Sequence, residues 1–475
     1  MKIALIKVPT TYADWYKRPV LGLTYISACL ESKGIDCQIF DAYFHSWSEE
    51  ELISHIENFK PNVVGLTAMT HEIVQAARVA SFLKKQLTVP TIVGGCHITA
   101  LPERTLEEFS AFDFGVYGEG EKTIVELLEY LENRSLNLNT IKGLVFRNDK
   151  GRIYVNEPRP FLSSQELNGL PYPAFHQYYG DNRNALAARD SCYVMFTSRG
   201  CPYSCAFCMR VLGRKIRRRS VQNVIQEMEY AIHRYDAHTI DFEDDIFLFD
   251  NENTRELLNL MVEKDLPKRV RWSGLTRADF VNPDLVSLAK RAGCYRLEMG
   301  IEAGEDTILK SISKAITVEQ VKRAVAAIKE AGISLGTYFI LGHPNENRET
   351  VRKTVDLAAE LNTDTIAVGL MVPYPGTKIY DMSLRGEGGY RLLTQEWSQY
   401  DKYGGRALEI KGLPYKELVR WQRRALINFY VKNLRFLDAL RFFWHKRNAL
   451  WFLIKKKFAK WKAWNKQSKQ ANGAY

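Results

Sequence analysis

A regular alternation of short apolar segments with amphipathic ones, which occurs twice, limits the fold of this chain more than any other feature. In the first block, five apolar segments of strand length are separated by segments of helical periodicity. The expected strands are residues 3–8, 37–41, 63–67, 91–94 and 114–117, with helices such as 21–32 and 72–85 between them. Such alternation with short connections predicts an α/β domain with a doubly wound, Rossmann-like parallel sheet.

The second block begins near residue 191, and its helical segments are longer. Its expected strands are residues 193–198, 239–244, 270–275, 296–301, 334–341 and 365–372. Consecutive strand–helix units of this kind predict a partial (β/α)6 barrel. Chemistry in barrels of this type lies at the carboxyl ends of the strands.

The remaining stretches set the expected domain boundaries. Residues 136–190 are rich in turn signals, such as Asn168-Gly169, and are expected to form a linker of short strands. We therefore expect a first domain over residues 1–135, this linker, the barrel over 191–400 and a helical, basic region over 401–475.

Composition excludes several classes of protein. The chain has 475 residues, of which 46% are hydrophobic and 25% charged, which excludes disordered and fibrous proteins. No apolar run reaches the roughly 18 residues that a membrane-spanning helix needs. The apolar start of the chain is interrupted by Lys7, so it is expected to be a strand and not a signal peptide. We expect a cytoplasmic protein.

The positive charge is concentrated in the tail. Residues 416–475 contain 16 Lys and Arg against two acidic residues, and five of the nine tryptophans. Helical spacing places Leu450, Ile454, Phe458 and Trp461 on one face, with lysines around it. This pattern fits a helical cap over the barrel, or a peripheral contact with a membrane surface. Nucleic acid is disfavoured as a partner, because no RNA-binding signature accompanies the tail.

Three of the eight cysteines lie within eight residues. Cys201, Cys205 and Cys208 follow the first expected barrel strand, and a chain with so few cysteines is not a disulfide scaffold. Zinc sites generally combine such cysteines with a second pair or with histidines, and no second pair is present here. A 4Fe–4S cluster takes thiolates at such spacings, and three thiolates leave one iron open.

The segment Cys201-x3-Cys205-x-Phe207-Cys208 resembles the radical S-adenosylmethionine (SAM) superfamily. The resemblance implies that the open iron chelates the amino and carboxylate groups of SAM. An external electron donor would reduce the cluster, and SAM would be cleaved to a 5′-deoxyadenosyl radical. Further segments at strand ends also resemble this family, namely 241–245, 300–304, 341–344 and 374–377. The SAM contacts implied by the resemblance are Phe207, Glu243, Asp244, Arg277, Glu302 and Leu341.

Within these segments the family's usual Gly-Gly-Glu is absent after the second barrel strand, which leaves individual roles there open. His343 could carry a proton, although a lone histidine is more often a packing residue. The sequence identifies no general acid or base.

The first domain resembles the cobalamin-binding domain that precedes some radical SAM barrels. The cobalamin contacts implied by this resemblance are Thr10, Gly22, Thr67, Met69, Thr70, Gly94, Gly95, His97, Gly118, Glu119 and Glu121. Many such domains carry Asp-x-His-x-x-Gly after the first strand, and its histidine ligates cobalt. Residues 9–22 contain no histidine here. We therefore expect cobalamin without a lower histidine ligand.

Together these resemblances imply a cobalamin-dependent methylase that acts on an unactivated carbon of a small molecule, with a lipid or other hydrophobic compound as one candidate. A cyclase or rearrangement enzyme with the same cofactors is the alternative. An RNA methylthiotransferase, with Cys29, Cys37 and Cys96 as second-cluster ligands, is disfavoured because two of these residues lie in a helical and a strand context. A non-enzymatic corrinoid or iron–sulfur sensor is the other class considered.

Overall fold

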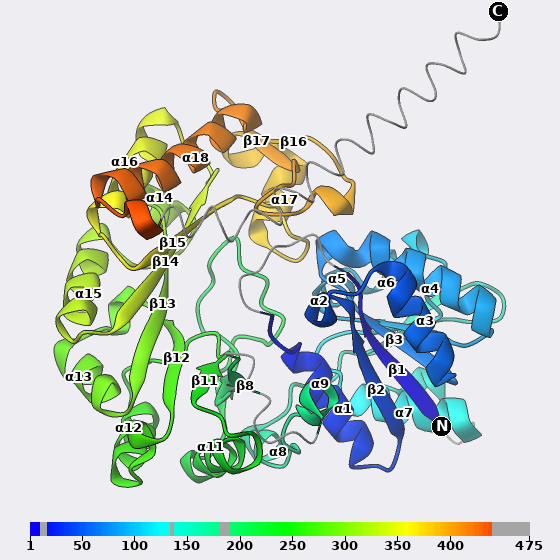
Figure 1. Ribbon diagram of the computed structural model, residues 1–475. Coiled ribbons are helices and arrows are strands. Elements are labelled where there is room, and N and C mark those ends of the chain that lie inside the picture. Colours follow the sequence, from blue (N-terminus) through cyan, green and yellow to red (C-terminus); the bar gives the residue numbers. More distant parts are fainter. Residues whose placement is uncertain (10–16, 134–136, 181–185, 187–190, 439–475) are drawn as a thin grey trace, which may run out of the picture.

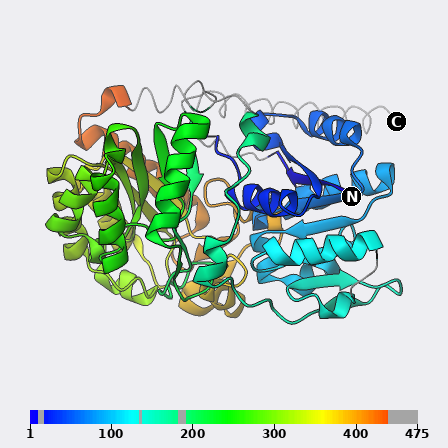
Figure 2. The same cartoon turned by 90° about the horizontal axis from the view of Figure 1, so that it is seen from below.

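A computed structural model describes residues 1–9, 17–133, 137–180, 186 and 191–438 of the chain. Two α/β bodies lie side by side, the N-terminal one in blue and cyan and the C-terminal one in green and yellow (Figure 1). The view from below in Figure 2 shows the same two bodies next to each other. The predicted Leu450, Ile454, Phe458 and Trp461 face lies outside the described residues.

The N-terminal sheet has seven strands in the order β2-β1-β3-β4-β5-β6-β7. Its first five strands are parallel to one another, as the sequence predicts. They are β1 (Lys2–Lys7), β2 (Asp36–Asp41), β3 (Val63–Thr67), β4 (Thr91–Gly94) and β5 (Phe114–Val116). Their burial is nearly complete, which is typical of parallel strands covered on both faces.

Two further strands come from the segment expected to be a linker. These are β6 (Leu144–Arg147) and β7 (Ile153–Val155). β6 pairs antiparallel with β5, and β7 pairs antiparallel with β6. Asn148 turns the chain between them, because its side-chain oxygen accepts from the backbone N–H groups of Lys150 and Arg152. The sheet is therefore mixed and extends to Val155.

Helices cover both faces of this sheet, so the doubly wound prediction is confirmed. They are α1 (Leu21–Glu31), α2 (Ala42–His45), α3 (Glu49–Phe59), η1 (Thr70–Glu72), α4 (Ile73–Leu87), α5 (Cys96–Ala100), α6 (Pro102–Glu108) and α7 (Glu121–Asn133). Ser48 begins α3 with a capping box to Glu51. The connection to the barrel contains η2 (Leu138–Thr140), α8 (Ser164–Asn168) and α9 (His176–Tyr179).

The second body is an open sheet of six parallel strands in the order β15-β14-β13-β12-β11-β8. The strands are β8 (Tyr193–Met195), β11 (Thr239–Phe242), β12 (Arg271–Thr276), β13 (Cys294–Glu302), β14 (Ser334–Leu341) and β15 (Thr365–Leu370). Each strand pairs with the next along the chain, and β8 and β15 form the two edges. This confirms the partial (β/α)6 barrel.

Helices lie on the outer side of this sheet (Figure 1). They are α11 (Val221–Tyr235), α12 (Glu252–Glu263), α13 (Pro283–Arg291), α14 (Asp306–Ser311), α15 (Val318–Glu330) and α16 (Arg348–Glu360), with short turns η3 (Leu266–Lys268) and η4 (Ala278–Phe280). They lie between the strands, as the alternation of the sequence predicts. Thr317 begins α15 with a capping box to Gln320.

The chain after β15 lies beside the N-terminal body and then covers the barrel edge. It contains α17 (Lys378–Arg385), η5 (Glu387–Gly389), β16 (Tyr390–Leu392), η6 (Trp397–Gln399), β17 (Leu408–Ile410) and α18 (Tyr415–Lys432). Trp397 and Tyr400 join the core beneath the N-terminal sheet, while α18 packs on α16 and β15. In the part of the chain that the structure describes, no helix is long and apolar enough to span a membrane.

Candidate active site

The three clustered cysteines lie on one loop that a short hairpin closes. Its strands are β9 (Ser198–Arg199) and β10 (Arg217–Arg218), which pair antiparallel with Arg199 opposite Arg217. Inside the loop, the backbone N–H of Cys201 donates to the carbonyl of Gly213 at 3.1 Å. Gly200 has φ +99°, and a Cβ there would collide with the carbonyl of Lys215. A glycine is therefore required directly before the first cysteine.

Two backbone hydrogen bonds fix the middle of this cysteine loop to the barrel. The N–H of Ala206 donates to the carbonyl of Ile312 at 2.9 Å, and its own carbonyl accepts from the N–H of Ile379 at 3.0 Å. The loop is thus held between the segment after β13 and the start of α17. It lies at the carboxyl ends of the barrel strands, where the sequence predicts the chemistry.

Three thiols on one loop are the kind of donor set that an iron–sulfur cluster takes. Among the described residues, no group of three His, Cys, Asp or Glu side chains is arranged to hold one metal ion. The thiolates of a cubane cluster bind three different irons, so they stand farther apart than the ligands of one ion. Desolvation, together with Cys205, Asp245 and Cys201, raises the pKa of the Cys208 thiol to about 12. Metal binding at this loop would therefore release protons.

Arg277 and Phe207, two of the predicted SAM contacts, are brought to this loop. The Arg277 guanidinium lies 3.5 Å from the ring centre of Tyr203, in the cysteine loop. It also donates to Asp279 at 3.0 Å and to the carbonyl of Lys314 at 2.8 Å. The Phe207 ring centre lies 6.4 Å from that of His343. An aromatic ring and an arginine thus border the cysteines on the barrel side.

Glu302, the last residue of β13, is paired with a lysine that the sequence did not indicate. The Lys314 ammonium lies 2.7 Å from the Glu302 carboxylate, and both side chains are buried. Glu302 itself has φ +75°, and Ser313 and Ala315 on either side of Lys314 also have positive φ. Backbone in this rare region at three nearby positions is the kind of strain that clusters at functional sites.

Three other predicted SAM contacts are already engaged. The Asp244 carboxylate accepts from the N–H of Thr197 and from two hydroxyls, of Thr197 and Ser198, at 2.6–2.9 Å. Burial raises its pKa to about 6. Asp244 therefore fastens the segment that follows β8, including Ser198 of β9, to the end of β11. Glu243 is exposed and lies 3.2 Å from Arg18 of the N-terminal body.

Leu341 is fully buried, and its carbonyl accepts from the N–H of Met371. Below it, the N–H groups of Gly342 and His343 both donate to the buried Glu346 carboxylate, at 2.6 and 3.1 Å. Burial raises the pKa of Glu346 to about 7. The imidazole of His343 is also buried, which lowers its pKa to about 4. These residues form a packed corner after β14.

The predicted cobalamin contacts fall into an open and a buried group. Space is open around the Cα of Gly22 and of Gly118, and Met69 is 52% exposed. Gly95 has φ +101°, and a Cβ there would lie 2.8 Å from the carbonyl of Ala68, so β3 and β4 end in close contact next to Gly94 and Thr67. Thr10 lies outside the described residues.

Thr70 and His97 are buried. Among the described residues, the hydroxyl of Thr70 and the imidazole of His97 have no hydrogen-bond partner. The His97 ring packs edge-on against Trp397 at 5.0 Å, and desolvation lowers its pKa to about 4. His97 therefore lies at the contact between the two bodies. Glu119 and Glu121 lie there as well, and their carboxylates bind Arg199 of the barrel.

A buried ion pair at the end of β1 also escaped prediction. The Lys7 ammonium lies 2.5 and 2.6 Å from the two oxygens of Glu72, whose carboxylate also accepts from the N–H of Met69. The sequence showed Lys7 only as an interruption of an apolar strand. A lysine at the end of the first apolar strand, together with Glu72 in the connection after the third strand, is the signal that could have revealed the pair.

The carboxyl ends of the two sheets face each other. Arg18, which follows β1, pairs with Asp241 and Glu243 at the end of β11. Ala100, which follows β4, lies against Gly376, which follows β15. Ligands of both sheets would therefore meet between the two bodies.

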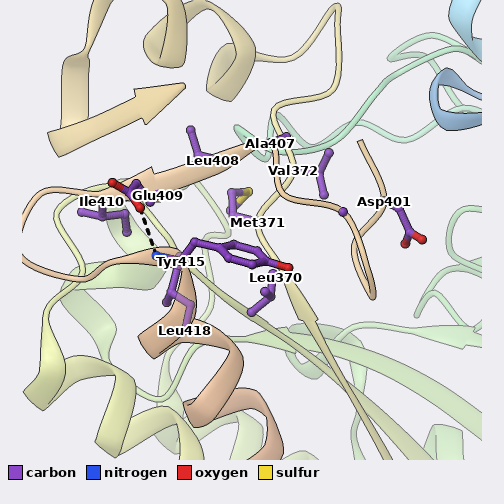
Figure 3. A pocket seen from close by; sticks show the side chains of 12 residues that line it. Leu370, Met371, Val372, Asp401, Ala407, Leu408, Glu409, Ile410, Tyr415 and Leu418 are labelled. Carbon is purple, nitrogen blue, oxygen red and sulfur yellow. Dashed lines mark hydrogen bonds between the residues drawn. The ribbon is translucent and has the colours of Figure 1, made fainter. Parts of the chain in front are cut away.

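A small, largely apolar pocket opens at the barrel edge (Figure 3). Leu370, Met371 and Val372 at the end of β15 form one side, and Leu418 of α18 forms another. The N–H of Tyr415 donates to Glu409 at its rim, at 3.2 Å.

Two family models match the chain. Residues 15–128 match the B12 binding domain, and residues 195–358 match the radical SAM superfamily. The first range falls in the N-terminal sheet, and the second covers the cysteine loop and β11 to β14 of the barrel.

Several curated proteins resemble the chain along most of its length. An uncharacterised methyltransferase of Pyrococcus horikoshii is 30% identical, over 91% of this chain and 93% of its own. Cytidylyl-2-hydroxyethylphosphonate methyltransferase of Streptomyces wedmorensis is 26% identical, over 77% and 78%. Anaerobic magnesium-protoporphyrin IX monomethyl ester cyclase of Rubrivivax gelatinosus is also 26% identical, over 76% and 66%.

A solved structure has the same arrangement of domains. The radical S-adenosylmethionine methyltransferase TsrM from Kitasatospora setae, with cobalamin and a [4Fe-4S] cluster bound, matches with a TM-score of 0.70. The match covers 89% of this chain and 90% of that chain at 18% identity. At this identity the likeness concerns the fold.

Proposed function

This chain belongs to the cobalamin-dependent radical SAM methyltransferase family, and from that premise we propose that it methylates an unactivated carbon of a small molecule. The observation that carries the proposal is the meeting of the two sheets at their carboxyl ends. A cluster site on one side and a corrinoid site on the other would then border one shared space.

The cysteine loop fits a 4Fe–4S cluster held by Cys201, Cys205 and Cys208. Bound there with SAM, the cluster supplies radical chemistry, and cobalamin on the opposite sheet supplies a methyl carrier. Arg277 offers a fork of N–H donors that suits the planar carboxylate of SAM. Phe207 borders the same space and excludes water on one side. We assign the SAM carboxylate to Arg277 and the remaining contacts to Phe207 and the Glu302–Lys314 pair.

On the opposite sheet, the open strand ends suit a large planar ligand. Gly22, Met69 and Gly118 leave room above β1, β3 and β5, and Gly95 allows the close approach of β3 and β4. Residues 9–22 contain no histidine, so we propose that no histidine of that loop ligates the cobalt from below.

The relatives support a small-molecule substrate. The pocket beside β15 has room for about one water molecule, so the proposal does not rest on it. One relative is named for a cytidylyl phosphonate substrate, so polar groups are also accommodated in this family. An external electron donor is needed to reduce the cluster. A cyclase or rearrangement enzyme remains the second candidate, because one relative is a cyclase.

The methylthiotransferase hypothesis finds no support in the cysteines of the N-terminal body. Cys29 is buried in α1 and Cys37 in β2, and burial raises their pKa values to about 12 and about 11. Two of the three thiols thus lie inside the core, in a helix and in a strand, and not on one loop as Cys201, Cys205 and Cys208 do.

The proposal is tested by supplying the anaerobic protein with SAM, cobalamin and a reductant. Methyl transfer with radical generation predicts both S-adenosylhomocysteine and 5′-deoxyadenosine, and a product heavier by one methylene. Formation of 5′-deoxyadenosine alone, with a product of unchanged mass, would instead support the cyclase. Paramagnetic resonance of the Co(II) form should lack nitrogen superhyperfine splitting; its presence would contradict the missing lower histidine.

A further inference from the structure

Glu119 touches both ends of the loop that carries the three cysteines. Its carboxylate lies 3.0 Å from Arg199 and 2.9 Å from Arg217, which are register partners in the hairpin that closes the loop. Glu119 belongs to the connection between β5 and α7 of the N-terminal body. One carboxylate of the corrinoid-binding body therefore holds the base of the cluster loop.

The surroundings of this contact are buried and balanced in charge. Glu121 adds a second ion pair to Arg199 at 2.7 Å, so two carboxylates face two guanidinium groups. All four residues are at most 7% exposed. Arg217 also donates to the carbonyl of Leu162, whose N–H donates to Glu119 at 2.6 Å. A buried network in which each charge is paired is rigid, because moving one charged group leaves its partner buried and unpaired.

The other polar contacts between the two bodies differ from this network. Arg18 is 36% exposed where it meets Asp241 and Glu243. On the opposite side, Arg104 donates to the hydroxyl of Tyr380 at 3.0 Å, and Trp397 donates to Glu108 at 2.5 Å. Of these contacts, the Glu119 network alone reaches the strands that flank the cysteines.

We propose that Glu119 is a positioning residue that fixes the cysteine loop relative to the corrinoid-binding body. This rests on the proposed function. It gives the Gly118-Glu119-Gly120-Glu121 segment a role other than direct contact with cobalamin. Cleavage of SAM at the cluster needs only the barrel. Methylation of cobalt by SAM crosses between the two bodies, so it depends on their register. Misplacement of a reacting group by about 1 Å can cost about a hundredfold in rate.

The test compares Glu119→Gln with wild type and with Glu360→Gln, whose exposed pair with Lys322 lies on the outer helices. Each full-length protein is loaded with iron–sulfide and hydroxocobalamin and given SAM and a reductant, without substrate. The account predicts normal iron and cobalt content in Glu119→Gln. The ratio of S-adenosylhomocysteine to 5′-deoxyadenosine should fall at least about tenfold, while Glu360→Gln keeps the wild-type ratio.

A second measurement is independent of turnover. Hydrogen exchange of the cofactor-free proteins should show faster exchange over residues 198–218 in Glu119→Gln and not in Glu360→Gln. An unchanged product ratio overturns the proposal, even if exchange is faster, since the contact would then be structural only. If wild type forms no S-adenosylhomocysteine, the proposed function fails. The positioning role of Glu119 is then decided by hydrogen exchange alone. Unchanged exchange over residues 198–218 in Glu119→Gln would overturn that role.

Glu121→Gln provides a milder variant should Glu119→Gln lose iron or fail to fold. It removes one ion pair to Arg199 and leaves both Glu119 contacts in place. The expected fall in the product ratio is smaller than for Glu119→Gln but measurable. An unchanged ratio in a correctly loaded Glu121→Gln protein overturns the proposal.

Discussion

The guanidinium of Arg277 lies 3.5 Å from the ring centre of Tyr203, so a strand-end residue of the barrel stacks on the cysteine loop itself. The Tyr203 hydroxyl in turn donates to Asp279 at 3.0 Å, and Asp279 accepts from Arg277. These three side chains form a closed set. A ligand that binds Arg277 would therefore lie next to Tyr203 of the cysteine loop.

Replacing Arg277 by lysine should weaken SAM binding by about tenfold to a hundredfold. Lysine keeps the charge but loses the planar fork and the stacking on Tyr203. The measurement is the dependence of 5′-deoxyadenosine formation on SAM concentration. Arg385→Lys, at an exposed pair with Glu387, is the matched control and should bind normally. Normal SAM affinity in Arg277→Lys would remove Arg277 from the site.

Replacing Lys314 by methionine should destabilise the fold by about 3–5 kcal/mol, because it leaves the buried Glu302 carboxylate unpaired. Denaturant unfolding of the cofactor-free protein measures this. The double variant Lys314→Met, Glu302→Gln should recover much of the loss. Lys322→Met, at an exposed pair with Glu360, should cost less than about 1 kcal/mol. Equal losses of unfolding free energy in Lys314→Met and Lys322→Met would show that the buried pair contributes no more to stability than an exposed one.

Glu346→Gln should change the pH dependence of stability. The folded-state pKa of Glu346 is raised to about 7 from an ordinary 4.5 by burial. Between these values the folded state holds a proton that the unfolded state has lost, so wild type loses stability as pH rises. The variant lacks this loss and should gain up to about 3 kcal/mol relative to wild type between pH 4.5 and 8.

The histidines act in the opposite sense. Burial lowers the pKa of His97 and of His343 to about 4, so they destabilise the fold as pH falls from 6.5 towards 4. Both histidines are present in wild type and in Glu346→Gln, so their contribution largely cancels in the difference. A stability difference between the two proteins that is independent of pH would contradict the raised pKa of Glu346.

The fold could be predicted because its strands are buried on both faces and its helices on one. Such burial gives apolar runs and helical periodicity that a single sequence displays. Short strands were expected in residues 136–190, and β6 and β7 are such strands, but the sequence did not show that they extend the N-terminal sheet. The end of β8 was placed too late in the sequence: the strand ends at Met195, and Ser198 belongs to β9, where its hydroxyl donates to Asp244, distant in sequence.

The sequence predicts site residues only where spacing along one loop carries the chemistry, and these assignments stay predictions. The three cysteines are local in sequence, and so are the glycines at the strand ends. Lys314 was missed because it reaches Glu302 from a turn whose conformation depends on packing. For Glu119 and Glu121 the sequence showed the residues but not their ion-pair partners. Their motif was visible, but their partners lie in the other body.

The end of α18 and the tail are expected to bind anionic membranes reversibly. Four apolar residues in the first part of the tail are each more than 50% exposed, namely Ile427, Val431, Leu434 and Leu437. Further basic and aromatic residues follow them in the sequence. Basic residues near an anionic surface contribute about 1 kcal/mol each, and less as salt rises. The full chain should pellet with anionic vesicles at low salt, and a chain ending near Lys446 should pellet less. If both stay in solution, the tail is a cap.

The most direct test of the account is the metal content of the anaerobically loaded protein, measured with and without its cluster cysteines. Wild type should hold the iron of one 4Fe–4S cluster and one equivalent of cobalt, and should cleave SAM. The triple variant Cys201→Ala, Cys205→Ala, Cys208→Ala should lose the iron and 5′-deoxyadenosine formation while keeping the cobalt. Cys294→Ala, at a buried thiol of β13, should keep both metals. Retention of a full cluster by the triple variant, or no uptake of cobalt by wild type, would contradict the account.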